Sequence, residues 1–313
     1  MPQTVRRWLV AALLVTSPGV AFVSPAALAR QQATPMASPI AGSFTPGAAG
    51  LGDPYFPLLG NGGYEVEHYD IALDLDVQDG SINTATTTID AVATQNLSAF
   101  NLDYRGPEID DILVNGDPAN YTRDGGELTI TPATPIAAAA PFQTVVTYHG
   151  TPDGGDDRFQ KGWWTTENSI FTVGEKISLS FSSCREANRY VIHGHPLDKA
   201  TYTITVTVPD EYNVVGNGRL AQLAHADAVA GQTSTNTYTW VNDEPTASYL
   251  VTFHAGLFET ETLQGPASIT LIDAFPADLP QRERAIFAKT PDMLETFTER
   301  FGPYPFASLG QTV

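Results

Sequence analysis

The clearest pattern in the chain runs from Thr201 to Val208, where apolar residues and threonines alternate. Apolar side chains fall at the even positions and threonines at the odd ones, which is the two-residue period of a half-buried β-strand rich in β-branched residues. Pro209 follows directly and ends the strand, because proline has no N–H to donate to a neighbouring strand. This segment predicts one long strand with one face in a hydrophobic core.

Similar runs recur between Tyr64 and Phe258. Turn residues separate them roughly every ten to twelve positions, and no helical pattern interrupts them, which is typical of antiparallel sheets packed face to face in a β-sandwich. We therefore predict a mainly β domain over residues 63–258. The strands expected before Thr201 lie at residues 64–77, 84–93, 100–104, 109–114, 127–131 and 142–149.

The period changes near residue 281, where apolar residues begin to recur at helical spacing. Pro291 lies inside this run, which predicts two short helices or a fresh helix start at that point. Gly302 and Pro303 close the helical segment, and a strand is expected after them. The apolar positions that carry this pattern are Ile286, Phe287, Met293, Leu294, Phe297 and Phe301.

The beginning of the chain has the layout of a secretory signal. Arg6 and Arg7 precede an apolar run, and Ala27 to Ala29 supply the small residues that signal peptidase needs. We predict a signal peptide over residues 1–29 with cleavage after Ala29, hence export to the cell envelope or the exterior. A retained membrane helix is the weaker alternative, because Ser17 to Gly19 interrupt the run and no stop-transfer segment follows.

Residues 30–62 are rich in Ala, Pro, Gly and Ser, and this composition predicts a linker. The whole chain has 313 residues and a formal net charge of −19 at pH 7, which argues against binding to nucleic acid or anionic lipid. A hydrophobic fraction of 42% is enough for a folded core. Cys184 is the single cysteine, so no internal disulfide can form, and we interpret it as a small apolar side chain.

Paired histidines are the first candidates for chemistry. His193 and His195 could present two nitrogens to zinc, but a metal site needs a third ligand, and only Glu186 and Asp198 are near in sequence. We favour turn-forming and hydrogen-bonding roles for the two histidines and keep a metal site as the alternative. The other histidines occur singly and are interpreted as ordinary sheet or surface residues.

Two adjacent pairs also invite a functional interpretation. Asp198 and Lys199 could act as acid and base, and Trp163 and Trp164 could stack on a sugar. Neighbouring residues of a strand point to opposite faces, so neither pair can meet one substrate atom or one ring together. We therefore predict turn capping for Asp198 and packing roles for the tryptophans.

Several segments, in order along the chain, resemble the M1 (aminopeptidase N-like) family of zinc peptidases. The most specific is the turn that opens the long strand, which is similar to the family's Asp-His-Pro-x-Asp-Lys-Ala-Thr motif. The resemblance implies a saddle-shaped amino-terminal β domain, followed over residues 259–313 by the start of a thermolysin-like α/β catalytic domain. It also implies peptides or proteins as partners and zinc in the full-length family. The matching segments are residues 52–70, 100–103, 114–116, 194–209, 215–218, 245–250 and 293–306.

The chain also departs from that family. None of its six histidines is followed by Glu, so the zinc-binding His-Glu-x-x-His motif is absent, and so is the family's Gly-x-Met-Glu-Asn loop. Ser182 stands where the family has an acid that reaches the substrate, and Gly194 replaces the usual Asp. We therefore carry over no catalytic, metal or substrate-binding residue, and we expect no cofactor in this chain.

Three hypotheses follow. The first is the amino-terminal β domain of an exported M1-type aminopeptidase, in a chain that ends before its catalytic motif and is inactive alone. The second is a secreted, non-catalytic module that binds peptide, protein or glycan. The third is a degenerate family member with an improvised metal site at His193 and His195. Under the first, the end of the chain should expose Phe297, Phe301, Tyr304 and Phe306.

Overall fold

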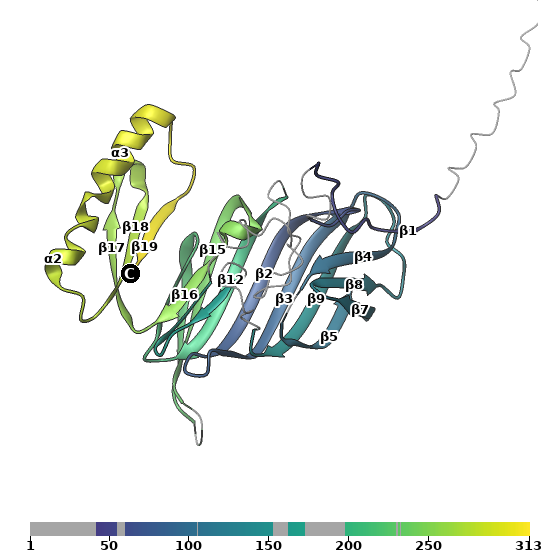
Figure 1. Ribbon diagram of the computed structural model, residues 1–313, viewed down its shortest axis with the longest axis horizontal. Coiled ribbons are helices and arrows are strands. Elements are labelled where there is room, and N and C mark those ends of the chain that lie inside the picture. Colours follow the sequence, from purple (N-terminus) through teal and green to yellow (C-terminus); the bar gives the residue numbers. More distant parts are fainter. Residues whose placement is uncertain are drawn as a thin grey trace, which may run out of the picture. The chain divides into compact units, whose positions relative to one another are not determined.

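The chain divides into two units, residues 1–41 and residues 42–313. The computed structural model describes residues 42–54, 60–104, 106–152, 162–172, 198–229, 231 and 233–313, all within the second unit (Figure 1). The predicted signal peptide and about half of the predicted linker lie outside the described residues, and so do Ser182, Cys184, Glu186, His193, Gly194 and His195. No helix among the described residues is long and apolar enough to cross a membrane.

An eight-stranded sheet forms the centre of the second unit, with its strands side by side in Figure 1. The long alternating segment is β12, and its apolar side chains are buried while its threonines are half-buried, as the pattern predicts. The strands, in their order across the sheet, are β14 (Arg219–Ala226), β15 (Thr235–Ala247), β12 (Lys199–Pro209), β2 (Tyr64–Asp76), β3 (Ser81–Ala93), β9 (Pro141–Gly150), β5 (Glu108–Val114) and β6 (Asp117–Pro118).

The mainly β prediction is confirmed, although three strand pairs, β1 with β4, β2 with β12 and β18 with β19, are parallel rather than antiparallel. β2 and β12 pair in parallel at the middle of the sheet, whereas the other neighbours in it are antiparallel. A parallel pair requires a long connection between its strands, and more than a hundred residues separate β2 from β12. Tyr69 and Tyr202 face each other across this pair, and their rings stack with centroids 5.1 Å apart.

Two four-stranded sheets pack against the large one and complete its core. Leu97, Leu102 and Ile130 of the first and Trp163 and Phe253 of the second are almost fully buried in the same hydrophobic cluster. The first contains β1 (Thr45–Pro46), β4 (Leu97–Asp103), β8 (Glu127–Thr131) and β7 (Asn120–Asp124). The second contains β10 (Trp163–Thr165), β11 (Ser169–Thr172), β16 (Phe253–Gly256) and β13 (Asn213–Gly216), and the short helix η2 (Ser248–Leu250) precedes β16.

The last part of the described chain is a three-stranded sheet with helices. The predicted pair of short helices and the strand after Gly302 are confirmed, and Pro291 lies in the first turn of α3. Gly302 ends that helix with φ of 98°, a conformation that glycine adopts without strain. The elements are β17 (Phe258–Gln264), η3 (Pro266–Ser268), β18 (Thr270–Pro276), α2 (Gln281–Arg284), η4 (Phe287–Lys289), α3 (Thr290–Phe301) and β19 (Ser308–Thr312).

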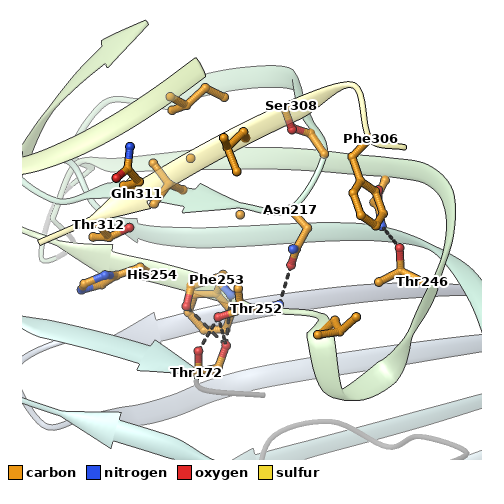
Figure 2. Close-up of a pocket in the computed structure, with 18 of the residues that line it drawn as sticks. Thr172, Asn217, Thr246, Thr252, Phe253, His254, Phe306, Ser308, Gln311 and Thr312 are labelled. Carbon is orange, nitrogen blue, oxygen red and sulfur yellow. Dashed lines mark hydrogen bonds between the residues drawn. The ribbon is translucent and has the colours of Figure 1, made fainter. Parts of the chain in front are cut away.

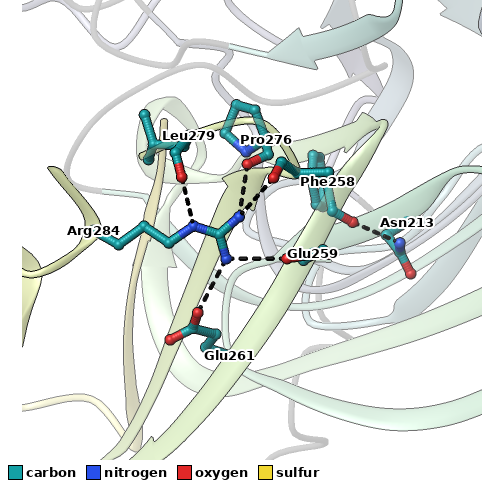
Figure 3. A network of polar contacts seen from close by, with 8 residues as sticks. Asn213, Phe258, Glu259, Glu261, Pro276, Leu279 and Arg284 are labelled. Carbon is teal, nitrogen blue, oxygen red and sulfur yellow. Dashed lines mark hydrogen bonds and ion pairs between the residues drawn. The ribbon is translucent and has the colours of Figure 1, made fainter. Parts of the chain in front are cut away.

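Arg284 fastens α2 to this sheet (Figure 3). Its guanidinium donates to the carboxylates of Glu259 and Glu261 on β17, at 3.0 and 3.2 Å. It also donates to the backbone oxygens of Leu279 and Pro276, at 3.2 and 2.9 Å. One side chain therefore holds the β18–α2 connection against β17, because five guanidinium hydrogens can serve several acceptors at once.

α3 uses only part of its apolar surface for packing. Leu294 is buried against Ile269 and Leu271. Phe297 and Phe301, in contrast, are 58% and 81% exposed, as predicted from their position near the end of the chain. An amphipathic helix normally buries its apolar stripe, so this face is free to pack against something else.

Candidate functional site

A cleft of about 660 Å³ lies between the second four-stranded sheet and β19 (Figure 2). Its walls come from β13 and the turn after it, from β11 and β16, and from the whole of β19. None of the described side chains that line it carries a carboxylate, an ammonium or a guanidinium group. In a chain with 16% charged residues, an uncharged cleft of this size points to a ligand that is itself uncharged over the length it buries.

His254 stands on the β16 wall with its ring held between two aromatic side chains. Its centroid lies 5.3 Å from Phe171, its cross-strand neighbour on β11, and 5.2 Å from Phe258. Burial lowers the pKa of His254 from 6.5 to about 4. The imidazole is therefore neutral at physiological pH, and one ring nitrogen can accept a hydrogen bond while the other donates one.

A group of hydroxyls and one amide fixes the floor of the cleft. The hydroxyl of Thr252 donates to the backbone oxygen of Thr172, and the two threonine hydroxyls lie 3.1 Å apart. The side-chain oxygen of Asn217 accepts the backbone N–H of Thr252 at 2.6 Å (Figure 2). These bonds tie the turn after β13 to β16 and β11, so the floor is rigid before any ligand arrives.

β19 forms the opposite wall and offers free backbone groups. The Ala307 carbonyl accepts from the Thr270 N–H at 3.0 Å, and the Val313 N–H donates to the Ala274 carbonyl at 3.1 Å. Successive residues of a strand direct their backbone groups to opposite sides, so the odd-numbered residues of this strand face β18. The even-numbered residues, including Gly310 at its middle, turn their N–H and C=O groups away from β18. No other described strand pairs with that edge.

Side-chain hydrogen bonds also hold β19 in place near both of its ends. The Ser308 hydroxyl donates to the Gly218 carbonyl and joins β19 to the start of β14. The Gln311 amide donates to Thr290 at 2.8 Å and to Asp273 at 3.2 Å. Tyr304 and Phe306 were expected to be exposed, but they are half-buried and line the cleft, because the chain after α3 folds back across its own sheet.

The two adjacent pairs singled out from the sequence, Trp163–Trp164 and Asp198–Lys199, do not line this cleft. Trp163 is buried and Trp164 stacks on Phe171 with centroids 6.0 Å apart, so the prediction that the two rings point to opposite faces is confirmed. Asp198 directly precedes β12, and Lys199, its first residue, is exposed. In the part of the chain that the structure describes, no group of three His, Cys, Asp or Glu residues could hold a metal ion.

Sequence reasoning missed the cleft itself. It treated His254 as a lone sheet residue, which it is, but gave no sign that β19 would face it. The walls come from segments around residues 171, 216, 253 and 310, so only the tertiary fold brings them together. The one usable signal was the absence of charge from residues 301–313, which were expected to form a strand after Gly302.

Comparison with known proteins finds similarity only at the level of structure. No family model matches the sequence, and no curated protein matches it. The M1 zinc metallopeptidase of Deinococcus radiodurans, in a mutant form bound to a Tyr-Ser-Ala substrate, is similar with a TM-score of 0.71 and 24% identity. A two-domain M1 zinc metallopeptidase mutant bound to L-arginine gives a TM-score of 0.72 and 24% identity.

The metallopeptidase from D. radiodurans without a stated ligand gives a TM-score of 0.68 and 23% identity. Each of these matches covers 84% of this chain, and the chain spans about 59% of the length of each solved structure. The uncovered remainder of those structures has no counterpart here, which is consistent with correspondence to an amino-terminal portion. The described chain therefore has the fold of M1 zinc metallopeptidases over somewhat more than half of their length.

Proposed function

We propose that this protein is the amino-terminal β portion of an exported M1-type zinc aminopeptidase, and that it contributes one side of a peptide-binding cleft. The observation that carries the proposal is the match to M1 zinc metallopeptidase structures over 84% of this chain. The family-like segments in the sequence support it independently, because they occur in the family's order.

The uncovered face of α3 supports the same proposal. Met293, Phe297 and Phe301 are all more than half exposed, and they border an apolar groove of about 490 Å³. Such a face is costly to leave in water and usually packs against another part of the protein or a partner. A catalytic domain that packs on this face of α3 would cover it.

This proposal assigns the zinc site to the longer protein and not to these 313 residues. The described residues offer no ligand set for it, and the sequence lacks His-Glu-x-x-His. In that motif two histidines one helical turn apart bind the metal and the glutamate activates water. We therefore propose that the 313-residue chain does not hydrolyse peptides by itself.

A secreted peptide-binding module is the second candidate, and the cleft favours it. The free edge of β19 can pair with an extended peptide, and the uncharged walls suit uncharged side chains. Peptide, rather than glycan, is the ligand that a free strand edge recognises through backbone hydrogen bonds. This candidate requires no further domain.

Turnover of amino-acyl fluorogenic substrates by the purified chain with added zinc tests the first proposal. We expect none, whereas chelator-sensitive turnover would contradict the inference from the missing motif and make His193 and His195 the next residues to mutate. A read of the nucleotides beyond codon 313 separates the two candidates. An open frame that encodes His-Glu-x-x-His supports the peptidase, and a stop codon with peptide binding by the short chain supports the module.

A further inference from the structure

We infer that the outer edge of β14 is a self-association surface, at which two copies of this chain pair their β14 strands antiparallel. The inference is independent of the peptidase proposal, because β14 takes no part in the cleft walls beyond the turn that precedes it. It rests on the exposure of β14, its lack of acidic residues, the face on which its leucines lie, and the register in which the strand complements itself.

β14 is the last strand of the eight-stranded sheet, and it is open to solvent. All 8 of its residues are exposed, on both faces of the strand. Over the described residues, β15 is its only hydrogen-bonded neighbour. A strand edge of this kind presents a row of backbone donors and acceptors that another strand can use.

Most of the devices that protect an edge strand are missing from β14. The strand contains no lysine, proline, aspartate or glutamate, and no acid occurs between Glu211 and Asp227. Arg219 and a bulge at Ala221 are the protective features it has, and both lie near the start of the strand. In a chain with net charge −19, β14 is a stretch where two copies can approach without bringing carboxylates together.

The leucines of β14 extend the apolar face of the core. Leu220 pairs with Trp240 and Leu223 with Tyr238 on β15, and directly paired residues lie on the same face of a sheet. Trp240 and Tyr238 are 3% and 5% exposed, because β13 covers them. The cover stops there, so Leu220 and Leu223 remain 43% and 55% exposed.

A second copy is the occupant that fits this edge, because β14 is complementary to itself. In this register Leu223 lies on the two-fold axis, opposite Leu223 of the other copy. The bulged residue Ala221 is skipped, as it is in the pairing with β15, so Leu220 lies opposite His225 of the other copy. Leu220 and Leu223 of both copies then form one apolar strip on the core face. Arg219 falls opposite Ala226 on the other face, so no like charges meet. An isologous pair of this kind closes as a dimer.

Replacing Leu223 tests the surface directly. We expect the wild-type chain to show a monomer–dimer equilibrium by sedimentation velocity across a concentration series. Leu223→Lys places two ammonium groups opposite each other on the axis, and it should raise the dimer dissociation constant on the order of tenfold or more. Leu263→Lys is the matched control, since Leu263 is 50% exposed on another edge strand, β17, and its replacement should leave the equilibrium unchanged.

A cross-link tests the register. In a Cys184→Ser background, Leu223→Cys should form an intermolecular disulfide under mild oxidation, whereas Leu263→Cys should not. Equal melting temperatures would show that the variants fold. A wild-type chain that stays monomeric throughout the series would overturn the inference. So would a Leu223→Lys variant that dimerises as the wild type does, or equal cross-linking of the two cysteine variants.

Discussion

His254 should make the folded protein sensitive to mild acid. Its pKa is 6.5 in an unfolded chain and about 4 in the fold, and burial is the cause. Between these two values the unfolded chain takes up a proton that the folded protein does not bind, so stability falls as the pH falls. From pH 7 to pH 5 the loss that this one group causes is about 2 kcal/mol.

The perturbation that isolates this effect is His254→Phe. Phenylalanine keeps a ring between Phe171 and Phe258 but cannot take up a proton, so the variant should lose less stability than the wild type when the pH drops. Many carboxylates titrate in the same range, and comparison of the two proteins at each pH cancels their contribution. Urea unfolding at pH 7 and pH 5 gives the four free energies that the comparison needs.

The histidine at position 149 provides a control of opposite sign. His149 lies on the surface 2.8 Å from Asp110, and the hydrogen bond to this carboxylate raises its pKa in the fold. It therefore stabilises the folded protein below its ordinary pKa and loses that effect as the pH rises through the folded value. His149→Phe should make the variant more sensitive to acid than the wild type. The same pH dependence in His254→Phe and in the wild type would refute the assignment of a half-buried, neutral imidazole to the cleft.

Two pairs of substitutions test the contacts that hold the elements around the cleft in place. Arg284→Met should lower the melting temperature clearly more than Arg282→Met, because the Arg284 side chain is 10% exposed and serves several acceptors, whereas Arg282 is 83% exposed. Gly218→Ala should be more destabilising than Gly116→Ala, although both glycines have positive φ of 82° and 85°. A Cβ at position 218 would lie 2.1 Å from the Val241 oxygen, while nothing lies within 4 Å at position 116. Equal melting temperatures within either pair would contradict these contacts.

The elements of the fold could be predicted from local pattern, because the pattern reports burial directly. The alternation from Thr201 to Val208 and the apolar spacing around Pro291 each correspond to an observed element. Strand direction was less accessible: the parallel pairing of β2 with β12 depends on which distant strands meet, and an alternating sequence is the same in either direction.

The candidate site could not be predicted from the sequence, for a related reason. Thr252, His254 and Gly310 have no common motif, and each has an ordinary local role in its own strand. Their proximity comes from the packing of the three-stranded sheet beside the four-stranded one, which no period in the sequence encodes. The pairs that did attract attention, such as Trp163 and Trp164, are conspicuous because of their composition, and the structure gives them packing roles.

The composition of the cleft limits what it can contribute to either proposed function. A free α-amino group carries a positive charge, and it is normally held by a carboxylate through charge-assisted hydrogen bonds. The described lining has no carboxylate side chain, so its strand edge, hydroxyls and neutral imidazole can recognise a peptide backbone but offer no acidic side chain to the end of a peptide. In an aminopeptidase, selection of the free terminus would then depend on residues outside this lining. Both proposals thus assign recognition of the peptide backbone to the cleft. They differ in whether another part of a longer protein supplies the carboxylate that holds the free α-amino group.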